Sequence, residues 1–307
     1  MTAAFPLNRI ALSTGVSLDV VDEGPRDGEV LIFLHGFPES HRTWRHQIAH
    51  LSGRYRCIAP DQRGYARSDK PADLSEYKVP KLTADVLALA NALGVGEFTL
   101  VGHDWGGAIA WATALRHQAS LPGGRIRRLI QCNAAHPYVY QHSLVFDAGQ
   151  RAATQYIREF RERDIEGEVA AKGVEWFFDD RFAKLSARGM TAEDRLAYID
   201  EWSQPGALTG MLNWYRASPL QVPAPDAPAE TTPFLDAPFP RLTIPALIVW
   251  GLEDEALLPC QLEGLERHID DVTVERIEGA GHFVPWEAPD AVNAAMDRWL
   301  VAHPLDH

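Results

Sequence analysis

The chain has 307 residues, of which 46% are hydrophobic and 23% are charged, and these are ordinary values for a globular protein. This length suits one large α/β domain or a domain with a sizeable insertion. The formal net charge of −13 argues against a surface that binds nucleic acid or an anionic membrane. We therefore expect neither kind of partner.

The three cysteines, Cys57, Cys132 and Cys260, lie far apart and form no CxxC motif. Two of them stand in apolar runs, which indicates buried free thiols in a reducing compartment. The first 13 residues lack the basic start and apolar core of a signal peptide. No apolar run approaches the roughly 18 residues of a membrane helix. These features predict a cytoplasmic protein and leave the oligomeric state open.

Apolar runs in the first part of the chain alternate with helical patterns. They predict strands at 8–13, 18–23, 30–34, 55–59, 98–101 and 126–132. Several of these runs are continuously apolar, which is typical of strands buried on both faces of a parallel sheet. Helical spacing of apolar residues predicts the helices 43–51, 79–93 and 108–115.

The pattern changes after the strand at 126–132. Residues 138–218 show helical periodicity with many aromatic side chains and no strand signal, and residues 219–240 include seven prolines, as in an extended connector. A strand at 245–250, a helix at 259–267, a strand at 272–277 and a helix at 289–302 follow. The alternation predicts an α/β fold with a mostly parallel, doubly wound sheet. We expect residues 1–135 and 241–307 to form its core domain and residues 136–240 an all-helical cap.

The sequence VGHDWGG at 101–107 lies between a predicted strand and a predicted helix. The spacing Gly-x-Asp-x-Gly is that of a nucleophile elbow, a strained turn that lifts one reactive side chain above a sheet. Serine is usual at the central position, whereas this chain has Asp104. An aspartate before a helix is also a common N-cap. The turn alone is therefore compatible with a catalytic or a structural role.

Other candidate catalytic residues follow later strands in the order nucleophile, acid, histidine. An acidic segment, Glu253-Asp254-Glu255, follows the strand at 245–250, and His282 follows the strand at 272–277. Because parallel strands end at one edge of a sheet, we expect these residues to meet Asp104 there. Asp254 would orient and stabilise the His282 imidazolium, with Glu253 and Glu255 as alternatives.

An aspartate nucleophile restricts the reaction. A carboxylate has a reference pKa of about 4, so Asp104 is ionised at neutral pH without help from a base. Its attack on a carbonyl would give an anhydride, whereas attack on a saturated carbon gives a covalent ester. His282 would then activate the water that hydrolyses this ester. The leaving group departs from a saturated carbon, which indicates an epoxide oxygen or a halide.

Hydrolysis of such an ester passes through an oxyanion. The usual donors are the backbone N–H after the nucleophile and an N–H of the loop after the third strand. In this chain these are the N–H groups of Trp105 and Phe37, and Phe37 stands in the turn His35-Gly36-Phe37-Pro38.

Five segments together resemble a known family: HGFPES at 35–40, DQRGYARS at 61–68, GHDWGG at 102–107, WGLED at 250–254 and GHF at 281–283. In this order they resemble the epoxide hydrolases of the α/β-hydrolase fold, over about residues 5 to 300. The resemblance implies an eight-stranded sheet with an inserted cap and favours Asp254 as the acid. It also implies conversion of an epoxide to a vicinal diol through an ester on Asp104.

In this family two cap tyrosines hydrogen-bond the epoxide oxygen. The segment Asn213-Trp214-Tyr215-Arg216 resembles the one that carries the second tyrosine, which implies this role for Tyr215. The first lies early in the cap, where Tyr156 matches best, with Tyr138 and Tyr140 nearby. The many cap aromatics favour an apolar or aromatic epoxide as the substrate, although they would also pack a cap core.

Two other classes of protein share parts of this pattern, the haloalkane dehalogenases and ligand-binding proteins of the same fold. Haloalkane dehalogenases share Asp104, Asp254 and His282 and resemble the chain at Trp105, but they usually have a polar halide-binding residue where Phe37 stands. A ligand-binding protein that had lost catalysis would have no need for all three of Asp104, Asp254 and His282. The sequence has no P-loop, dinucleotide fingerprint or spaced cluster of metal ligands. We therefore expect no cofactor and no metal.

Overall fold

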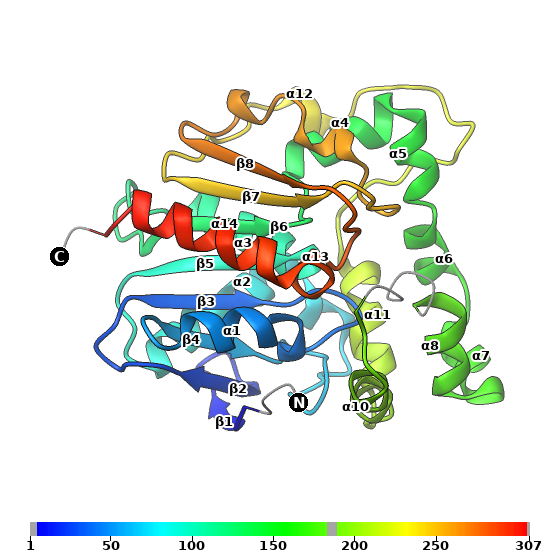
Figure 1. Ribbon diagram of the computed structural model, residues 1–307. Helices are drawn as coiled ribbons and strands as arrows, with labels where there is room; N and C mark the ends of the chain where they lie inside the picture. Colours follow the sequence, from blue (N-terminus) through cyan, green and yellow to red (C-terminus); the bar gives the residue numbers. More distant parts are fainter. Residues whose placement is uncertain (1–4, 183–188, 306–307) are drawn as a thin grey trace.

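The computed structural model describes residues 5–182 and 189–305. Its centre is an eight-stranded sheet in the order β1-β2-β4-β3-β5-β6-β7-β8 (Figure 1). The strands are β1 (Asn8–Ala11), β2 (Ser17–Glu23), β3 (Val30–Leu34), β4 (Arg56–Pro60), β5 (Phe98–His103), β6 (Ile126–Cys132), β7 (Ala246–Gly251) and β8 (Val272–Ile277). β2 is antiparallel to β1 and β4, and all other pairs are parallel. The predicted α/β-hydrolase fold with a mostly parallel sheet is confirmed.

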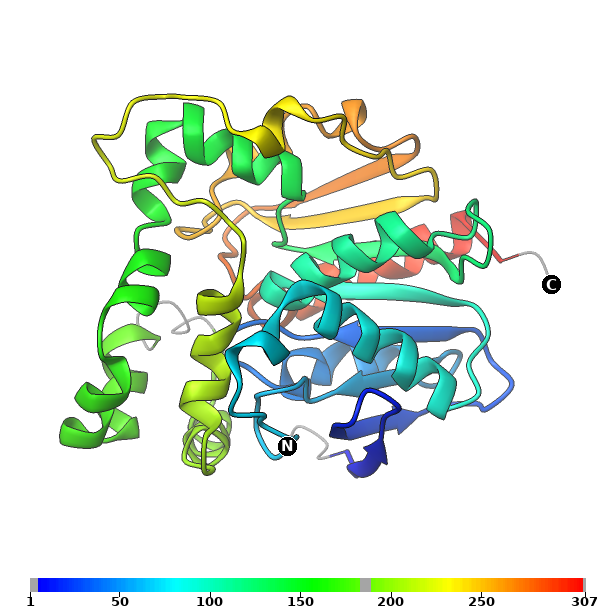
Figure 2. The ribbon, with the colours of Figure 1, turned by 180° about the vertical axis from the view of Figure 1, so that it is seen from behind.

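Helices cover both faces of the sheet. In Figure 1, α1 (Arg45–Leu51) and α14 (Pro289–Ala302) lie in front of it, and Figure 2 shows α2 (Val79–Ala92) and α3 (Asp104–His117) on the opposite face. Successive residues of a strand point to opposite faces. Accordingly, Leu31 of β3 packs in the cluster with α1 and α14, while Ile32 packs in the cluster with α2 and α3. This double cover explains why β3 and β7 are apolar at nearly every position.

The chain between β6 and β7 forms helices that lie beside the core on one side of the sheet (Figure 1). Among its described residues there is no strand, as the sequence predicts. The helices are α4 (Pro137–Phe146), α5 (Ala148–Ala153), α6 (Tyr156–Glu162), α7 (Ile165–Lys172), α8 (Val174–Arg181), α10 (Ala192–Trp202), α11 (Ala207–Ala217) and α12 (Pro233–Asp236). We use "cap" for residues 136–240, and its status as a separate domain stays a prediction.

Three predicted elements differ from the structure. The helix expected at 259–267 is instead two short 3-10 turns, Pro259–Leu262 and Leu265–Arg267, because Gly264 has a left-handed backbone with φ of 74°. The helix expected at 43–51 starts as the 3-10 turn His41–Trp44 before α1. The connector at 219–240 contains the single turn of α12.

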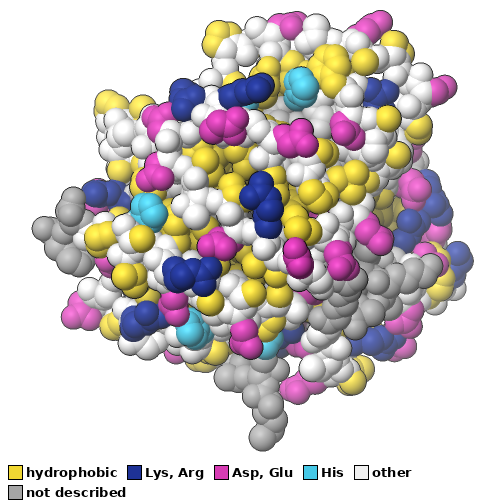
Figure 3. Space-filling view, turned by 45° about the horizontal axis from the view of Figure 1, so that its top comes forward, with side chains coloured by type: hydrophobic (Ala, Val, Ile, Leu, Met, Phe, Trp, Pro, Cys, Tyr) yellow, Lys and Arg dark blue, Asp and Glu magenta, His cyan; other side chains and the backbone are white. Residues whose placement is uncertain are grey.

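Acidic and basic side chains are interspersed on the face of the molecule in Figure 3, with hydrophobic side chains between them. Within the described ranges, none of the helices combines the length and apolar character needed to cross a membrane.

Candidate active site

Asp104 occupies a strained turn between β5 and α3. Its φ of 50° lies in the left-handed region, which costs a residue other than glycine roughly 1–3 kcal/mol. Two residues later, a Cβ on Gly106 would stand 2.3 Å from the backbone oxygens of Leu34 and His35. Only glycine allows this close approach of α3 to the end of β3. The turn is therefore a nucleophile elbow in geometry as well as in sequence.

The structure brings Asp104, His282 and Asp254 together beyond the ends of three parallel strands. The Nε2 atom of His282 lies 3.5 Å from Oδ2 of Asp104, and its Nδ1 atom lies 2.7 Å from Oδ2 of Asp254. Asp254 is 3% exposed, whereas the alternative acids Glu253 and Glu255 are both exposed. Of the three acidic residues in this segment, Asp254 is thus the one placed to orient the histidine.

The two carboxylates and the histidine determine one another's charge. Burial alone would lower the pKa of His282, but Asp254 and Asp104 raise it well above 6.5. Burial alone would raise the pKa of Asp104, but its interaction with His282 keeps this pKa below 3.8. In the resting site His282 is therefore an imidazolium between two carboxylates, and Asp104 is ionised.

The expected oxyanion donors lie at Asp104. The backbone N–H of Phe37 donates a 2.7 Å hydrogen bond to Oδ1 of Asp104. Trp105 is the second residue of α3, and the first N–H groups of a helix have no acceptor within the helix. The Phe37 N–H thus already stabilises negative charge on Oδ1, while Oδ2 faces the histidine, and the role of the Trp105 N–H stays a prediction.

The predicted cap tyrosines lie against this turn. The Tyr215 ring, on α11, meets the rings of Phe37 and Trp105 edge-on at centroid distances of 4.9 and 5.1 Å. Tyr156, at the start of α6, has its ring centroid 6.1 Å from that of Tyr215. Burial and the charge of Asp104 raise the pKa of both phenols well above 10, with a further contribution from Tyr140 at Tyr156 and from Tyr156 at Tyr215. Both hydroxyls therefore stay protonated and can donate hydrogen bonds.

Tyr140 of α4, one of the two nearby alternatives to Tyr156, also reaches the site. Its hydroxyl interacts with that of Tyr156 and lies 3.3 Å from Oγ1 of Thr154. The other alternative, Tyr138, donates instead to the backbone oxygen of Leu235 in the connector. The structure thus leaves Tyr156 and Tyr140 as candidates for the first cap tyrosine.

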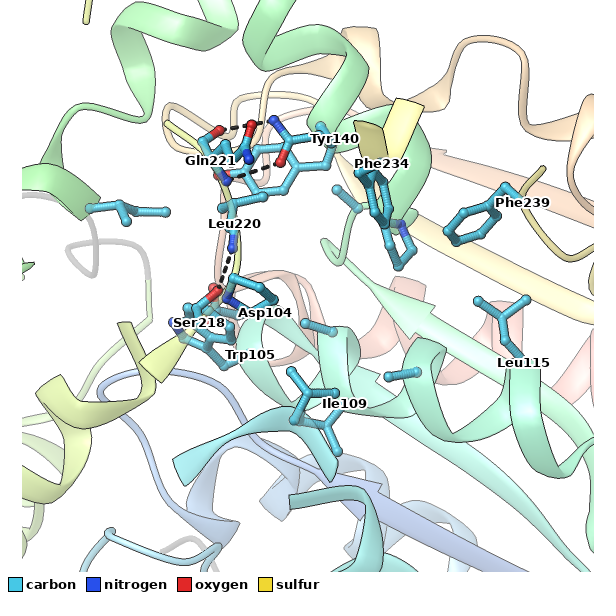
Figure 4. A pocket seen from close by; sticks show the side chains of 18 of the residues that line it. Asp104, Trp105, Ile109, Leu115, Tyr140, Ser218, Leu220, Gln221, Phe234 and Phe239 are labelled. Carbon is cyan, nitrogen blue, oxygen red and sulfur yellow. Dashed lines mark hydrogen bonds between the residues drawn. The ribbon is translucent and has the colours of Figure 1, made fainter. Parts of the chain in front are cut away.

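A cavity of about 790 Å³ opens beside Asp104 (Figure 4). Its wall includes Asp104, Trp105, Tyr156 and Tyr140, and it continues along one face of α3 past Ile109 to Leu115. Phe234, Phe239 and Leu220 of the connector face it from the cap side. Most of this wall is apolar, and an apolar molecule of elongated shape would fit along it. Among residues 5–182 and 189–305, no cluster of three or more histidine, cysteine or acidic side chains could hold a metal ion.

Comparisons with known proteins show the family of the chain. The alpha/beta hydrolase fold family matches residues 29–289. A solved epoxide hydrolase of this superfamily, from metagenomes of hot environments, is 51% identical, with a TM-score of 0.92 over 98% of this chain and 100% of its own. The chain belongs to the epoxide hydrolases of the alpha/beta hydrolase superfamily.

Two further members of this family are similar over most of their length. Epoxide hydrolase 2 of Caenorhabditis elegans is 34% identical over 291 residues, which are 93% of this chain and 77% of the relative. The epoxide hydrolase of Bacillus megaterium, solved with an inhibitor, is 31% identical, with a TM-score of 0.83 over 96% of this chain and 100% of its own.

Asn133 had no predicted role, but its side chain supports the carboxylate of Asp254. Asn133 follows β6 with a φ of 40°, and its amide donates to Oδ2 of Asp254 at 2.7 Å. The same side chain accepts from the Gly251 N–H at 2.8 Å. It thereby fixes both the carboxylate and the end of β7. The one signal in the sequence was its place directly after a buried strand, at the edge where Asp104 also lies.

Glu287 and His103 hold the backbone of His282 and of its two neighbours in the chain. Glu287 accepts from the N–H groups of Gly281 and Phe283, at 2.6 and 3.0 Å. The His103 ring donates from Nε2 to the His282 carbonyl oxygen at 2.8 Å, and its Nδ1 lies 3.0 Å from Oε2 of Glu39. His103 is therefore a packed, hydrogen-bonded residue beside the elbow.

Proposed function

We propose that this protein hydrolyses epoxides to vicinal diols through a covalent ester on Asp104. The observation that carries the proposal is the position of the Asp104 carboxylate, with one oxygen at the Phe37 N–H and the other facing His282, whose far side meets Asp254. A solved complex of a Bacillus megaterium epoxide hydrolase mutant with its product, a naphthyloxy propanediol, supports a diol product.

In the first step, Oδ2 of Asp104 attacks a ring carbon of the epoxide and the carbon–oxygen bond of the ring breaks. The electron pair of that bond stays on the ring oxygen, which receives a proton from a cap tyrosine. Tyr215 and Tyr156 are the proposed donors, because both are neutral phenols close to Asp104. The product of this step is an ester between Asp104 and the substrate.

In the second step, esterification removes the negative charge of Asp104, which lowers the pKa of His282, and the proton that His282 then loses returns, through water, to the tyrosinate left by the first step. Neutral His282 then takes a proton from water through Nε2, while Asp254 holds Nδ1. The hydroxide attacks Cγ of Asp104, and the negative charge that forms on Oδ1 is stabilised by the N–H groups of Phe37 and Trp105. Collapse of this intermediate releases the diol, whose alkoxide takes the proton from His282. The proton that remains on the Asp104 carboxyl group then passes to His282, which restores the resting site.

The apolar wall of the cavity supports an apolar or aromatic substrate of elongated shape. Asp104, Ala108, Ala112 and Leu115 of α3 follow one another along this wall. With a rise of about 1.5 Å per residue, they span about 16 Å. The epoxide would lie at the Asp104 end of this surface.

The test is product analysis with a panel of epoxides and haloalkanes of increasing length. We expect the wild type to form diols and the Asp104→Ala variant to form none. In His282→Gln, the ester should accumulate and appear as a mass increase on the Asp104 peptide. Halide release equal to or faster than diol formation would instead make the protein a dehalogenase. Binding with no adduct and no product for any compound would indicate a protein without catalysis.

A further inference from the structure

Gln150, on the cap helix α5, has every hydrogen-bonding atom of its buried carboxamide occupied. The side chain is 0% exposed. Its Nε2 donates to the Ala256 oxygen at 2.8 Å and to Oγ1 of Thr154 at 2.9 Å. Its Oε1 accepts from the Leu258 N–H at 2.8 Å and from Nε2 of Gln261 at 3.0 Å. Two donors and two acceptor positions are all that a carboxamide offers.

The backbone groups that Gln150 holds belong to the segment directly after the acid. Within this segment, the N–H groups of Ala256 and Leu257 both donate to Oδ1 of Asp254 at 2.8 Å. Gln150 binds the Ala256 carbonyl oxygen, which lies between these two donors in the chain, and the Leu258 N–H, which directly follows them. The position of the Asp254 carboxylate thus depends on a segment that a cap residue fixes.

We propose that Gln150 is a positioning residue for hydrolysis of the ester: it holds the segment Ala256–Leu258 so that Asp254 stays against Nδ1 of His282. This inference rests on the proposed ester mechanism and adds a connection from the cap to the acid. Asp254 has another support in Asn133, which contacts Oδ2. Loss of Gln150 therefore loosens the Oδ1 side of the carboxylate without removing the acid.

This loosening affects hydrolysis of the ester rather than its formation. Nucleophilic attack by Asp104 needs no base, whereas water activation needs a correctly oriented His282. The groups facing His282 are Asp104, Asp254 and the ring of His103, at a centroid distance of 5.0 Å, with Glu39 behind that ring. In the ester only Asp254 remains as a carboxylate in contact with His282. A looser Asp254 therefore lowers the pKa of His282 in the ester.

A second connection leads from Gln150 toward the substrate side. Oγ1 of Thr154 contacts both the Gln150 amide and the Tyr140 hydroxyl, and Tyr140 interacts with Tyr156. If Gln150 acted through this path, its loss would slow ring opening instead of ester hydrolysis. Thr154→Val removes the hydroxyl and leaves the contacts of Gln150 with Ala256 and Leu258 in place.

Gln118 offers a matched control. Its carboxamide, which is 3% exposed, also holds two backbone groups, donating to the Arg241 oxygen at 3.2 Å and accepting from the Thr243 N–H at 2.7 Å. It stands 14 residues after Asp104 in the chain, just past the end of α3, so it is about 20 Å away along that helix. Gln118→Leu removes the same kind of backbone clamp without touching the site.

The experiment follows ester formation and ester decay separately, by rapid quenching and intact-protein mass spectrometry with styrene oxide as the probe. In Gln150→Leu we expect ester decay to slow at least about tenfold, with ester formation within about threefold of wild type. The pH midpoint of ester decay should move down by about half a unit or more. Gln118→Leu should leave both rates and the midpoint unchanged, and Thr154→Val should leave ester decay unchanged.

Gln150→Met, which keeps the side-chain length, serves if the leucine variant does not fold. Ester decay within twofold of wild type in a folded Gln150 variant, with an unmoved pH midpoint, would overturn the inference. An equal fall in both rates, or slow decay in Thr154→Val as well, would also overturn it. If the wild type turned over styrene oxide without any ester, the proposed mechanism itself would fail, and the role of Gln150 with it.

Discussion

Phe37 and Asp104 stand 67 positions apart in the sequence and meet through a 2.7 Å hydrogen bond from the Phe37 N–H to Oδ1 of Asp104. This bond leaves Oδ2 as the oxygen that faces His282. The two oxygens of Asp104 are thereby distinguished before substrate binds. In the proposed mechanism Oδ2 attacks the epoxide, and Oδ1 already lies where the oxyanion forms.

The loop that carries the Phe37 N–H depends on the absence of a side chain at Gly36. A Cβ there would lie 2.4 Å from Cβ and 2.5 Å from Oδ1 of Asp104. We expect Gly36→Ala to push the loop away and lower kcat on the order of 100- to 1000-fold. Gly53→Ala is the control, because its Cβ would meet nothing within 4 Å. Steady-state kinetics with equal kcat for both variants would contradict the role of this loop.

The cap tyrosines should affect ring opening alone. Tyr215→Phe removes a proposed proton donor near Asp104, so we expect ester formation to slow about 100-fold or more. Ester decay should be unchanged, because it uses His282 and water. Rapid-quench kinetics measures both steps, and ester formation within twofold of wild type would exclude Tyr215 as a donor.

A pair of variants tests whether Tyr156 or Tyr140 is the first cap tyrosine. Tyr156→Phe and Tyr140→Phe each remove one of two hydroxyls that contact each other and line the cavity. We expect a larger loss of ester formation in Tyr156→Phe, because its ring lies beside Tyr215. A larger loss in Tyr140→Phe would transfer the role to Tyr140.

The charge of His282 makes folding stability depend on pH. Its pKa is raised in the folded state by Asp254 and Asp104 against the opposing effect of burial. A raised pKa contributes stability that is fully present below about pH 6.5 and is lost as pH rises through the folded value. We expect the stability difference between wild type and His282→Gln, from urea unfolding, to shrink as pH rises above 6.5. A difference that stays constant with pH would show that His282 is not an imidazolium in the resting protein.

The length of the cavity should limit the length of the substrate. Ala112 lies in the wall eight residues after Asp104, about 12 Å farther along α3. Ala112→Phe should lower kcat/KM for a long aryl-alkyl epoxide at least about tenfold through overpacking. A short epoxide, which occupies only the Asp104 end, is the internal control. Equal loss for both would mean that long substrates do not use this part of the cavity.

Continuous apolar runs located the central elements from the sequence. β3, β6, β8 and α14 have the predicted bounds. β3 and β6 are buried between two layers, and α14 begins at Pro289. The segment 259–267 has apolar residues at helical spacing, but Gly264 interrupts it with a left-handed backbone. The spacing of apolar residues does not reveal a backbone conformation of this kind.

The residues that meet at the site were predictable where each had a local motif. Asp104, Asp254 and His282 each follow a strand, so topology alone brings them together. Asn133 also follows a strand but stands in no catalytic motif, and Gln150 lies in the cap; their partners lie 121 and 106 positions away. Their roles follow only from the packing of distant segments.

In the proposed mechanism an Asp104 oxygen, not a water oxygen, enters the product in the first turnover. With enzyme in excess over epoxide in water labelled with oxygen-18, the ester mechanism predicts an unlabelled diol in the first turnover. The label should instead appear in the Asp104 peptide, because water attacks Cγ of the ester. Oxygen-18 in the diol of the first turnover, with an unlabelled Asp104 peptide, would contradict the account.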